Sequence, residues 1–171
     1  MSRSRTRLMV GTGLGLALVA TVLALLGSMR SMQVATVSRS TTATAEAVWE
    51  LWADVPQRTR WDEGLEWIRS DGPFGQGTTG TVKLKGQPQR HFEVIEANRP
   101  TEYTDRFFLP AGTRMDWRHR IEQRPDGQYV TFTVRVQGPT ALLLTPILRS
   151  ILGEELPGTV DRLVTMAEAK N

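Results

Sequence analysis

The sequence predicts an α+β fold, with a curved antiparallel sheet of seven strands around a long C-terminal helix and one transmembrane helix before it. Three observations lead to this prediction. An uncharged apolar stretch occupies Leu8–Gly27, short alternating segments separated by turn residues fill the middle, and an apolar stripe with helical spacing runs towards the end. The 171 residues suffice for one ordinary domain beyond the apolar stretch.

The N-terminal stretch has the length of a membrane-spanning helix. Leu8–Gly27 contains no charge, and about 20 apolar residues cross the hydrocarbon core of a bilayer. It exceeds the roughly 7–15 residues of a signal-peptide core, and no clear small-x-small cleavage site follows Ala24. We therefore predict an uncleaved signal anchor over residues 8–28, and a cleaved signal peptide is the alternative.

The charges beside this stretch predict its topology. Arg3, Arg5 and Arg7 precede it, whereas only Arg30 closely follows it. By the positive-inside rule, residues 1–7 are expected in the cytoplasm and the later part of the chain outside. The localisation predicted is therefore the cytoplasmic membrane, crossed once, with the C-terminal domain on the outer side.

A short linker at residues 29–32 is expected to keep the domain, residues 33–171, close to the bilayer. The membrane is thus one expected partner. Gly11 and Gly15 have the spacing seen where membrane helices approach closely, so other membrane-protein subunits are further candidates. Simple tolerance of glycine in membrane helices is the alternative explanation of this spacing.

The excess of basic over acidic residues in this chain comes from its N-terminal segment. Of 21 lysines and arginines, four lie in residues 1–32, which leaves 17 against 18 aspartates and glutamates. This composition gives no basic footprint for nucleic acid, so no nucleic-acid partner is expected. The chain has no cysteine, which means only that a disulfide framework is not used.

The domain begins with a strand and a helix. Residues 32–40 alternate as a strand does, and Thr44 is a suitable N-cap for the helix that follows. The apolar stripe of that helix comprises Ala45, Val48, Trp49 and Trp52. The helix should end at Val55-Pro56, because the residue before proline avoids the α region. We expect Trp49 in the core and Trp61 near a rim, while Trp52 fits either core packing or partial exposure.

Six further strands are predicted, at residues 65–70, 80–86, 90–97, 102–109, 113–123 and 129–137. The last helix opens at Gly138-Pro139, and we expect a kink or a broken turn where Gly153 and Pro157 interrupt it. Its apolar stripe comprises Leu144, Leu148, Leu152, Leu156, Val160, Leu163 and Ala167.

A hairpin closed at residues 110–112 fixes the register of two strands. It places Tyr103 opposite His119 and Asp105 opposite Trp117 on the apolar face. On the other face, the same register pairs opposite charges across the strands, which supports it. These outer pairs are Arg106 with Asp116 and Glu102 with Arg120. The outer arginines are therefore interpreted as a solvated ion-pair face rather than a binding patch.

The order of strand, two short helices, six strands and long helix resembles the helix-grip fold of the START-like, Bet v 1-like (SRPBCC-type) superfamily. The polyketide cyclase/dehydrase branch is the most similar. The segment ATAEAVWELWADVPQRTRW, Ala43–Trp61, resembles the family's helix carrying Val-Trp, its Asp and Pro segment and its following Trp. GPFGQGTTGTVKLKG and HRIEQRPDGQYVTFTV are also similar. The resemblance covers about residues 33–169 and implies a ligand cavity between sheet and helix.

No motif for a catalytic nucleophile, a zinc protease or a phosphate-binding loop is present in the sequence. The two histidines, His91 and His119, are expected on different strands with opposite facing, so neither a metal site nor a cofactor is predicted. No residue is assigned as catalytic, and binding is favoured over catalysis.

Tyr103, Asp105 and His119 are the few polar groups expected on the apolar face. Three interpretations remain open: they orient the polar head of a ligand, they form an acid/base pair, or they only satisfy one another or lie at the wet mouth of the cavity. The predicted ligand-binding residues are Tyr103, Asp105, His119, Trp117, Phe107, Phe92, Phe132 and Trp61.

The predicted function is membrane-tethered binding of a hydrophobic small molecule, such as a lipid, a quinone or a polyketide-like compound. The implied cavity and the anchor together suggest a ligand that dissolves in the membrane. Two alternatives are an accessory subunit of a membrane complex and a cyclase or dehydratase that uses Tyr103, Asp105 and His119.

Overall fold

The computed structural model describes residues 21–22 and 30–170. The predicted transmembrane stretch, residues 8–28, thus lies outside the described residues except for Thr21 and Val22, and it stays a prediction. Among the residues that are described, no helix is long and apolar enough to cross a membrane.

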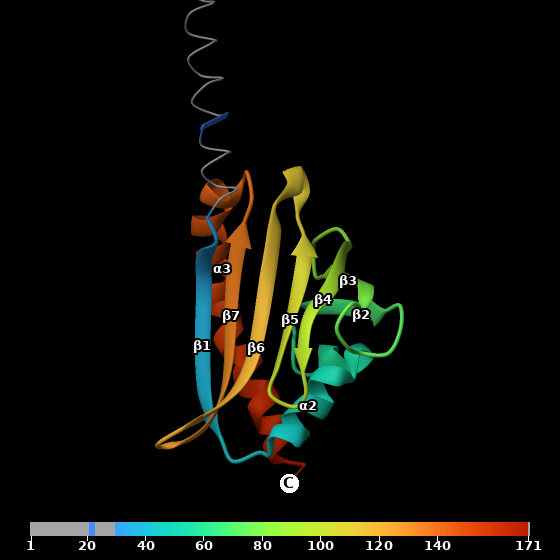
Figure 1. The fold of residues 1–171 in the computed structure, drawn as a ribbon, viewed down its shortest axis with the longest axis vertical. Helices are drawn as coiled ribbons and strands as arrows, with labels where there is room; N and C mark the ends of the chain where they lie inside the picture. The colour runs from blue at the N-terminus through green and yellow to red at the C-terminus, as the bar shows by residue number, and fades with distance from the viewer. Residues whose placement is uncertain (1–20, 23–29, 171) are drawn as a thin grey trace, which may run out of the picture.

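Seven antiparallel strands form one sheet in the order β1-β7-β6-β5-β4-β3-β2. Figure 1 shows α3 running along the side of the sheet that β1 and β7 form. This arrangement confirms the predicted α+β fold with a seven-stranded sheet and a long C-terminal helix. The elements are β1 Met32–Thr41, α2 Ala45–Ala53, η1 Val55–Arg60, β2 Leu65–Ser70, β3 Thr79–Leu84, β4 Arg90–Asn98, β5 Glu102–Phe108, η2 Pro110–Gly112, β6 Arg114–Arg124, β7 Gly127–Gln137 and α3 Ala141–Glu168.

The sheet is irregular at three places where the strand register shifts. These shifts lie between Gln33 and Ala35 in β1, between Leu65 and Trp67 in β2, and between Val94 and Glu96 in β4. Extra residues of this kind bend a strand and increase its twist. They therefore help the sheet to curve around the helices.

The register predicted for β5 and β6 is confirmed. Tyr103 pairs with His119 and Asp105 with Trp117, and the outer residues pair as the charges indicated. On the outer face, Glu102 forms an ion pair with Arg118 and lies 3.5 Å from Arg120. This confirms the interpretation of the outer arginines as an ion-pair face.

The helix after β1 is capped as predicted, because the Thr44 hydroxyl oxygen accepts a hydrogen bond from the Ala47 amide at 3.2 Å. Trp49 and Trp52 are both buried in the main core. The placement of Trp61 near a rim is wrong, since its side chain is only 3% exposed. The reason is that α3 covers it: Arg162 Nε donates to the Trp61 carbonyl oxygen at 3.1 Å.

The C-terminal helix begins at Ala141 and runs without a break to Glu168. The helix is therefore not broken at Gly153 and Pro157, and the kink predicted there stays a prediction. Proline at a helix interior clashes with the carbonyl four residues earlier, here that of Gly153. Burial of Leu152, Leu156, Val160, Leu163 and Ala167 holds the helix against the sheet on both sides of this pair.

The inner face of the sheet contains two apolar clusters. The main cluster joins α2 and α3 to β1 and to β5–β7. The second, smaller cluster comprises Val55, Leu65, Ile68, Val82, Phe92 and Val94. Phe107 packs against both clusters and therefore marks the boundary between them.

Candidate functional site

A buried ion pair occupies the inner face of the sheet. Arg58, from η1, donates from Nη1 to Oδ2 of Asp105, on β5, at 2.9 Å, and both side chains are 3% exposed. Arg58 Nε also donates to the backbone oxygen of Trp52 at 2.8 Å. The guanidinium is thus held between the end of α2 and the middle of the sheet.

Aromatic rings surround this ion pair. The rings of Tyr103 and His119 stack at 4.0 Å between centroids with only 3° between their planes. The Arg58 guanidinium lies 4.9 Å from the Tyr103 ring centroid, within the range of a cation–π contact. Trp52 packs edge-on against both stacked rings, at 5.2 Å from Tyr103 and 5.9 Å from His119.

Six buried side-chain atoms have no hydrogen-bond partner in the part of the chain that is described, and all six belong to this neighbourhood. We call the residues that carry them the buried polar cluster. The atoms are Trp52 Nε1, Arg58 Nη2, Tyr103 OH, Asp105 Oδ1, Trp117 Nε1 and His119 Nδ1. An unsatisfied buried polar group typically costs about 1–3 kcal/mol, so such groups are few and rarely gather by chance. Their concentration makes this cluster the candidate functional site of the domain.

The unpartnered atoms determine which hydrogen-bond donors and acceptors a ligand would need to satisfy them. The indole nitrogens of Trp52 and Trp117 and the free nitrogen of Arg58 can only donate hydrogen bonds. The free oxygen of Asp105 accepts when the carboxyl is ionised, and the Tyr103 hydroxyl does either. The cluster therefore suits a head group that is rich in acceptors and carries at least one donor.

Burial governs the ionisation of the cluster. It lowers the pKa of His119 well below its usual range, with a further contribution from the Arg58 charge, and it raises the pKa of Tyr103 well above the usual value. Both rings are thus neutral near pH 7. Burial also raises the pKa of Asp105, while Arg58 opposes that shift. For Arg58 itself, burial acts to lower the pKa, but Tyr103 and Asp105 outweigh it and the pKa rises.

The structure tests one of the earlier interpretations of Tyr103, Asp105 and His119, namely that they satisfy one another. Tyr103 and His119 touch by stacking, and the hydrogen bond of Asp105 goes to Arg58. The three residues therefore do not satisfy one another by hydrogen bonds. A general acid and a general base act on the substrate and need no bond to each other, so the acid/base interpretation stays a prediction.

Five of the eight predicted site residues lie in the buried polar cluster or pack against it. Tyr103, Asp105, Trp117 and His119 belong to the buried polar cluster, and Phe132 packs edge-on against His119 at 4.2 Å.

The remaining three lie further out. The ring centroids of Trp61 and Phe132 lie 6.2 Å apart, and so do those of Phe107 and Trp117. Phe92 belongs to the second apolar cluster and contacts Phe107 at 6.0 Å. Among the predicted site residues, Phe92 is therefore linked to the buried polar cluster only through Phe107 and Trp117.

Sequence reasoning missed Arg58 and the polar role of Trp52. A signal for Arg58 was present, because Val55, Arg58 and Trp61 are spaced by three residues. In a 3-10 helix, which has 3.0 residues per turn, such positions share one face. All three side chains are buried, whereas Arg60 is exposed.

Comparison with solved structures shows the same fold. MLL2253 from Mesorhizobium loti aligns with a TM-score of 0.60 at 13% identity, over 83% of this chain and 99% of that one. The di-domain ARO/CYC StfQ from the steffimycin biosynthetic pathway aligns with a TM-score of 0.67 at 6% identity, over 82% of this chain and 51% of that one. Ara h 8.0201 aligns with a TM-score of 0.63 at 10% identity, over 83% of this chain and 100% of that one.

Comparison by sequence is more specific. No curated protein matches the chain. The family model described as polyketide cyclase / dehydrase and lipid transport matches residues 32–168, which span the folded domain from β1 to the end of α3. The chain therefore belongs to the polyketide cyclase/dehydrase and lipid transport family.

Proposed function

We propose that this protein binds a hydrophobic small molecule between the sheet and α3, with the polar head of that molecule at the buried polar cluster. The observation that carries the proposal is the gathering of six unpartnered buried polar atoms in an otherwise apolar interior. An apolar site with a few well-placed polar groups is typical of small-molecule binding. The family and its fold support hydrophobic ligands as the class.

The charge balance of the cluster narrows the class of ligand. Asp105 already neutralises Arg58, and the rings of Tyr103 and His119 are neutral. An anionic head would bring an unbalanced charge into a buried site, which is costly. A neutral head with carbonyl and hydroxyl groups fits better, as in a quinone, a polyketide-like compound or an uncharged lipid.

We further propose that the domain is tethered to the outer face of the cytoplasmic membrane by residues 8–28. The uncharged stretch Leu8–Gly27 and the arginines before it support this topology. The tether would hold the domain where a membrane-soluble ligand is concentrated. A role for Gly11 and Gly15 in contacting other subunits lies outside the described residues and stays a prediction.

The ligand proposal is tested by mass spectrometry of organic extracts from the full chain purified in detergent. A hydrophobic molecule should be recovered in roughly equimolar amount with the protein. The matched variants are His119→Phe, which removes Nδ1 but keeps an aromatic ring against Tyr103 and Phe132, and His91→Phe, on the outer face.

His119→Phe should weaken retention of the ligand about tenfold to a hundredfold, as the loss of one hydrogen bond worth about 1–3 kcal/mol implies. His91→Phe should leave retention unchanged. The absence of any molecule from extracts of the unmodified protein would contradict the proposal, and so would equal retention by both variants.

A further inference from the structure

The exposed apolar side chains of the domain gather at one of its ends. Among the described residues, six large apolar side chains are exposed, and one of these, Val22, precedes the domain. We call the other five the apolar end: Phe108, Leu142, Leu143, Ile147 and Ile151. Leu143 is 72% exposed and Ile147 57% exposed, which is unusual for consecutive turns of a helix in a folded domain.

The strand register brings these residues to the same end. Phe108 pairs with Arg114, Arg114 pairs with Gln137, and α3 starts four residues later at Ala141. The hydroxyl oxygens of Thr113 and Thr140 lie 2.6 Å apart, which ties the β5–β6 hairpin to the start of α3.

The first turns of α3 have a buried side and, opposite to it, an exposed apolar side. Ala141, Thr145 and Leu152 are buried on the side that faces β1. Leu143, Ile147 and Ile151 follow one another at intervals of four and are exposed. Residues four apart share a helix face, so these three form a continuous stripe that the rest of the domain does not cover.

The charges nearest to Phe108, Leu143 and Ile147 along the chain are basic, and the first acidic residues of α3, Glu154 and Glu155, come one turn after Ile151. The segments 30–38, 107–115 and 136–153 contain Arg30, Arg114 and Arg149 and no acidic residue. Arg149 also donates to the backbone oxygen of Gln33 at 3.1 Å, which places its guanidinium beside β1. A basic rim around apolar side chains is the pattern of segments that bind anionic lipid surfaces.

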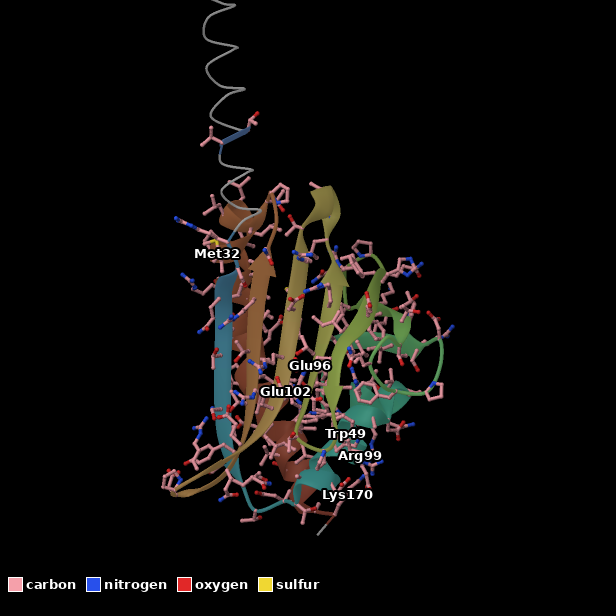
Figure 2. All side chains as sticks on the ribbon, viewed as in Figure 1. Met32, Trp49, Glu96, Arg99, Glu102 and Lys170 are labelled. Carbon is pink, nitrogen blue, oxygen red and sulfur yellow. The ribbon has the colours of Figure 1, made fainter. Side chains whose placement is uncertain are left out.

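The chain enters the domain at the same end. β1 begins at Met32, which pairs with Val136 near the end of β7, and Figure 2 shows Met32 at the opposite end of the domain from Lys170. In the sequence, Met32 follows Gly27 by five positions, which span at most about 18 Å when extended. Whatever holds Leu8–Gly27 therefore holds the apolar end close to it.

We propose that the apolar end docks on the surface of a lipid bilayer, with Phe108, Leu143 and Ile147 among the lipid chains and the arginines at the phosphates. A second copy of this chain is a poorer occupant, because a symmetric contact would bring these arginines against each other. The docking goes beyond ligand binding: it fixes the orientation of the domain on the membrane.

The chain has no cysteine, so single reporters can be introduced without background. Leu143→Cys in the full chain, labelled with an environment-sensitive fluorophore, is reconstituted with vesicles of phosphatidylcholine and phosphatidylglycerol. Lys170→Cys, at the other end, is the matched control. The label at 143 should shift to the blue and be quenched by brominated acyl chains, whereas the label at 170 should show neither effect.

A label at 143 that brominated lipids do not quench would overturn the proposal, and a blue shift without quenching would identify a protein contact instead. A second experiment uses Phe108→Cys as the reporter and adds Leu143→Glu and Ile147→Glu. These exposed side chains are not part of the core, so thermal unfolding should not change, but lipid quenching at 108 should fall severalfold. Unchanged quenching at 108 would contradict the proposal. Neither readout depends on the extracted ligand. A negative result for membrane docking therefore leaves the ligand-binding proposal untouched, and the reverse also holds.

Discussion

Two arginine–aspartate pairs lie on opposite faces of the sheet at β5. Asp105 and Arg106 are neighbours on β5, but Asp105 points inward to Arg58 and Arg106 points outward to Asp116. The outer pair is bidentate, since Arg106 donates from Nε and Nη2 to the two oxygens of Asp116 at 2.7 and 2.8 Å. The inner pair has a single hydrogen bond and leaves Arg58 Nη2 and Asp105 Oδ1 without partners.

The difference shows what the inner pair is suited for. Arginine and carboxylate interact most strongly when they form two parallel hydrogen bonds. The outer pair has this bidentate geometry although both of its side chains are partly in water. The inner pair loses its hydration and does not complete its hydrogen bonds, although a buried pair offsets desolvation only when the bonding is complete. Stability alone does not explain such an arrangement, whereas a ligand that supplies the missing partners does.

The largest effect that separates the pairs is expected from removing one aspartate. Asp105→Ala leaves Arg58 buried and unpaired, which should lower the free energy of unfolding by about 3–5 kcal/mol. Asp116→Ala leaves Arg106 partly in solvent and should cost no more than about 1 kcal/mol. Urea unfolding of both variants measures the two losses. Similar losses would mean that the inner pair is not desolvated as the structure indicates.

A double substitution sharpens the comparison. Arg58→Met with Asp105→Leu replaces the buried pair by apolar side chains, which should keep the unfolding free energy unchanged or raise it by about 1–4 kcal/mol. Thermal and urea unfolding of ligand-free protein give this value. A strong destabilisation of the double variant, comparable with that of Asp105→Ala, would assign the inner pair a structural role.

The smallest expected effect is a pH dependence from Asp62, near the inner pair. Burial, against the hydrogen bond from the Gly64 amide and the charges of Arg162 and Arg58, raises the pKa of Asp62 to about 6. The unfolded value is about 3.9, so folding favours the protonated form, and stability should rise as the pH falls from about 6 to about 4. Asp62→Asn should remove this slope and add about 1–2 kcal/mol near pH 7.

Asp116→Asn, on the outer face, is the control for this experiment and should keep the slope. Guanidinium unfolding at several pH values between 4 and 8 measures it. A wild-type stability that increases from pH 4 to pH 6, with Asp62→Asn following the same curve, would show that Asp62 has no raised pKa.

Much of the fold could be predicted because local patterns determine it. Alternation with period two, the turn at residues 110–112 and opposite charges across the strands together define the register that pairs Tyr103 with His119. The same reasoning identified Asp105 as an inward-facing polar group. These features depend on neighbouring residues or on one hairpin.

The parts that could not be predicted depend on contacts between distant segments. Arg58 is separated by 47 positions from its partner Asp105, and no local pattern joins them. Trp61 is buried because α3 reaches its carbonyl through Arg162, 101 positions later. The continuity of α3 through Pro157 likewise comes from its packing on the sheet.

The amount of hydrophobic molecule extracted per protein tests the central claim most directly. It is compared among the unmodified chain, the inner-pair variant Arg58→Met with Asp105→Leu, and the outer-pair variant Arg106→Gln with Asp116→Asn. The account predicts about one molecule per chain for the unmodified and outer-pair proteins, and at least roughly a tenfold loss for the inner-pair variant, which loses the hydrogen bonds to the head group. Equal amounts in all three proteins, or no molecule in any, would contradict it.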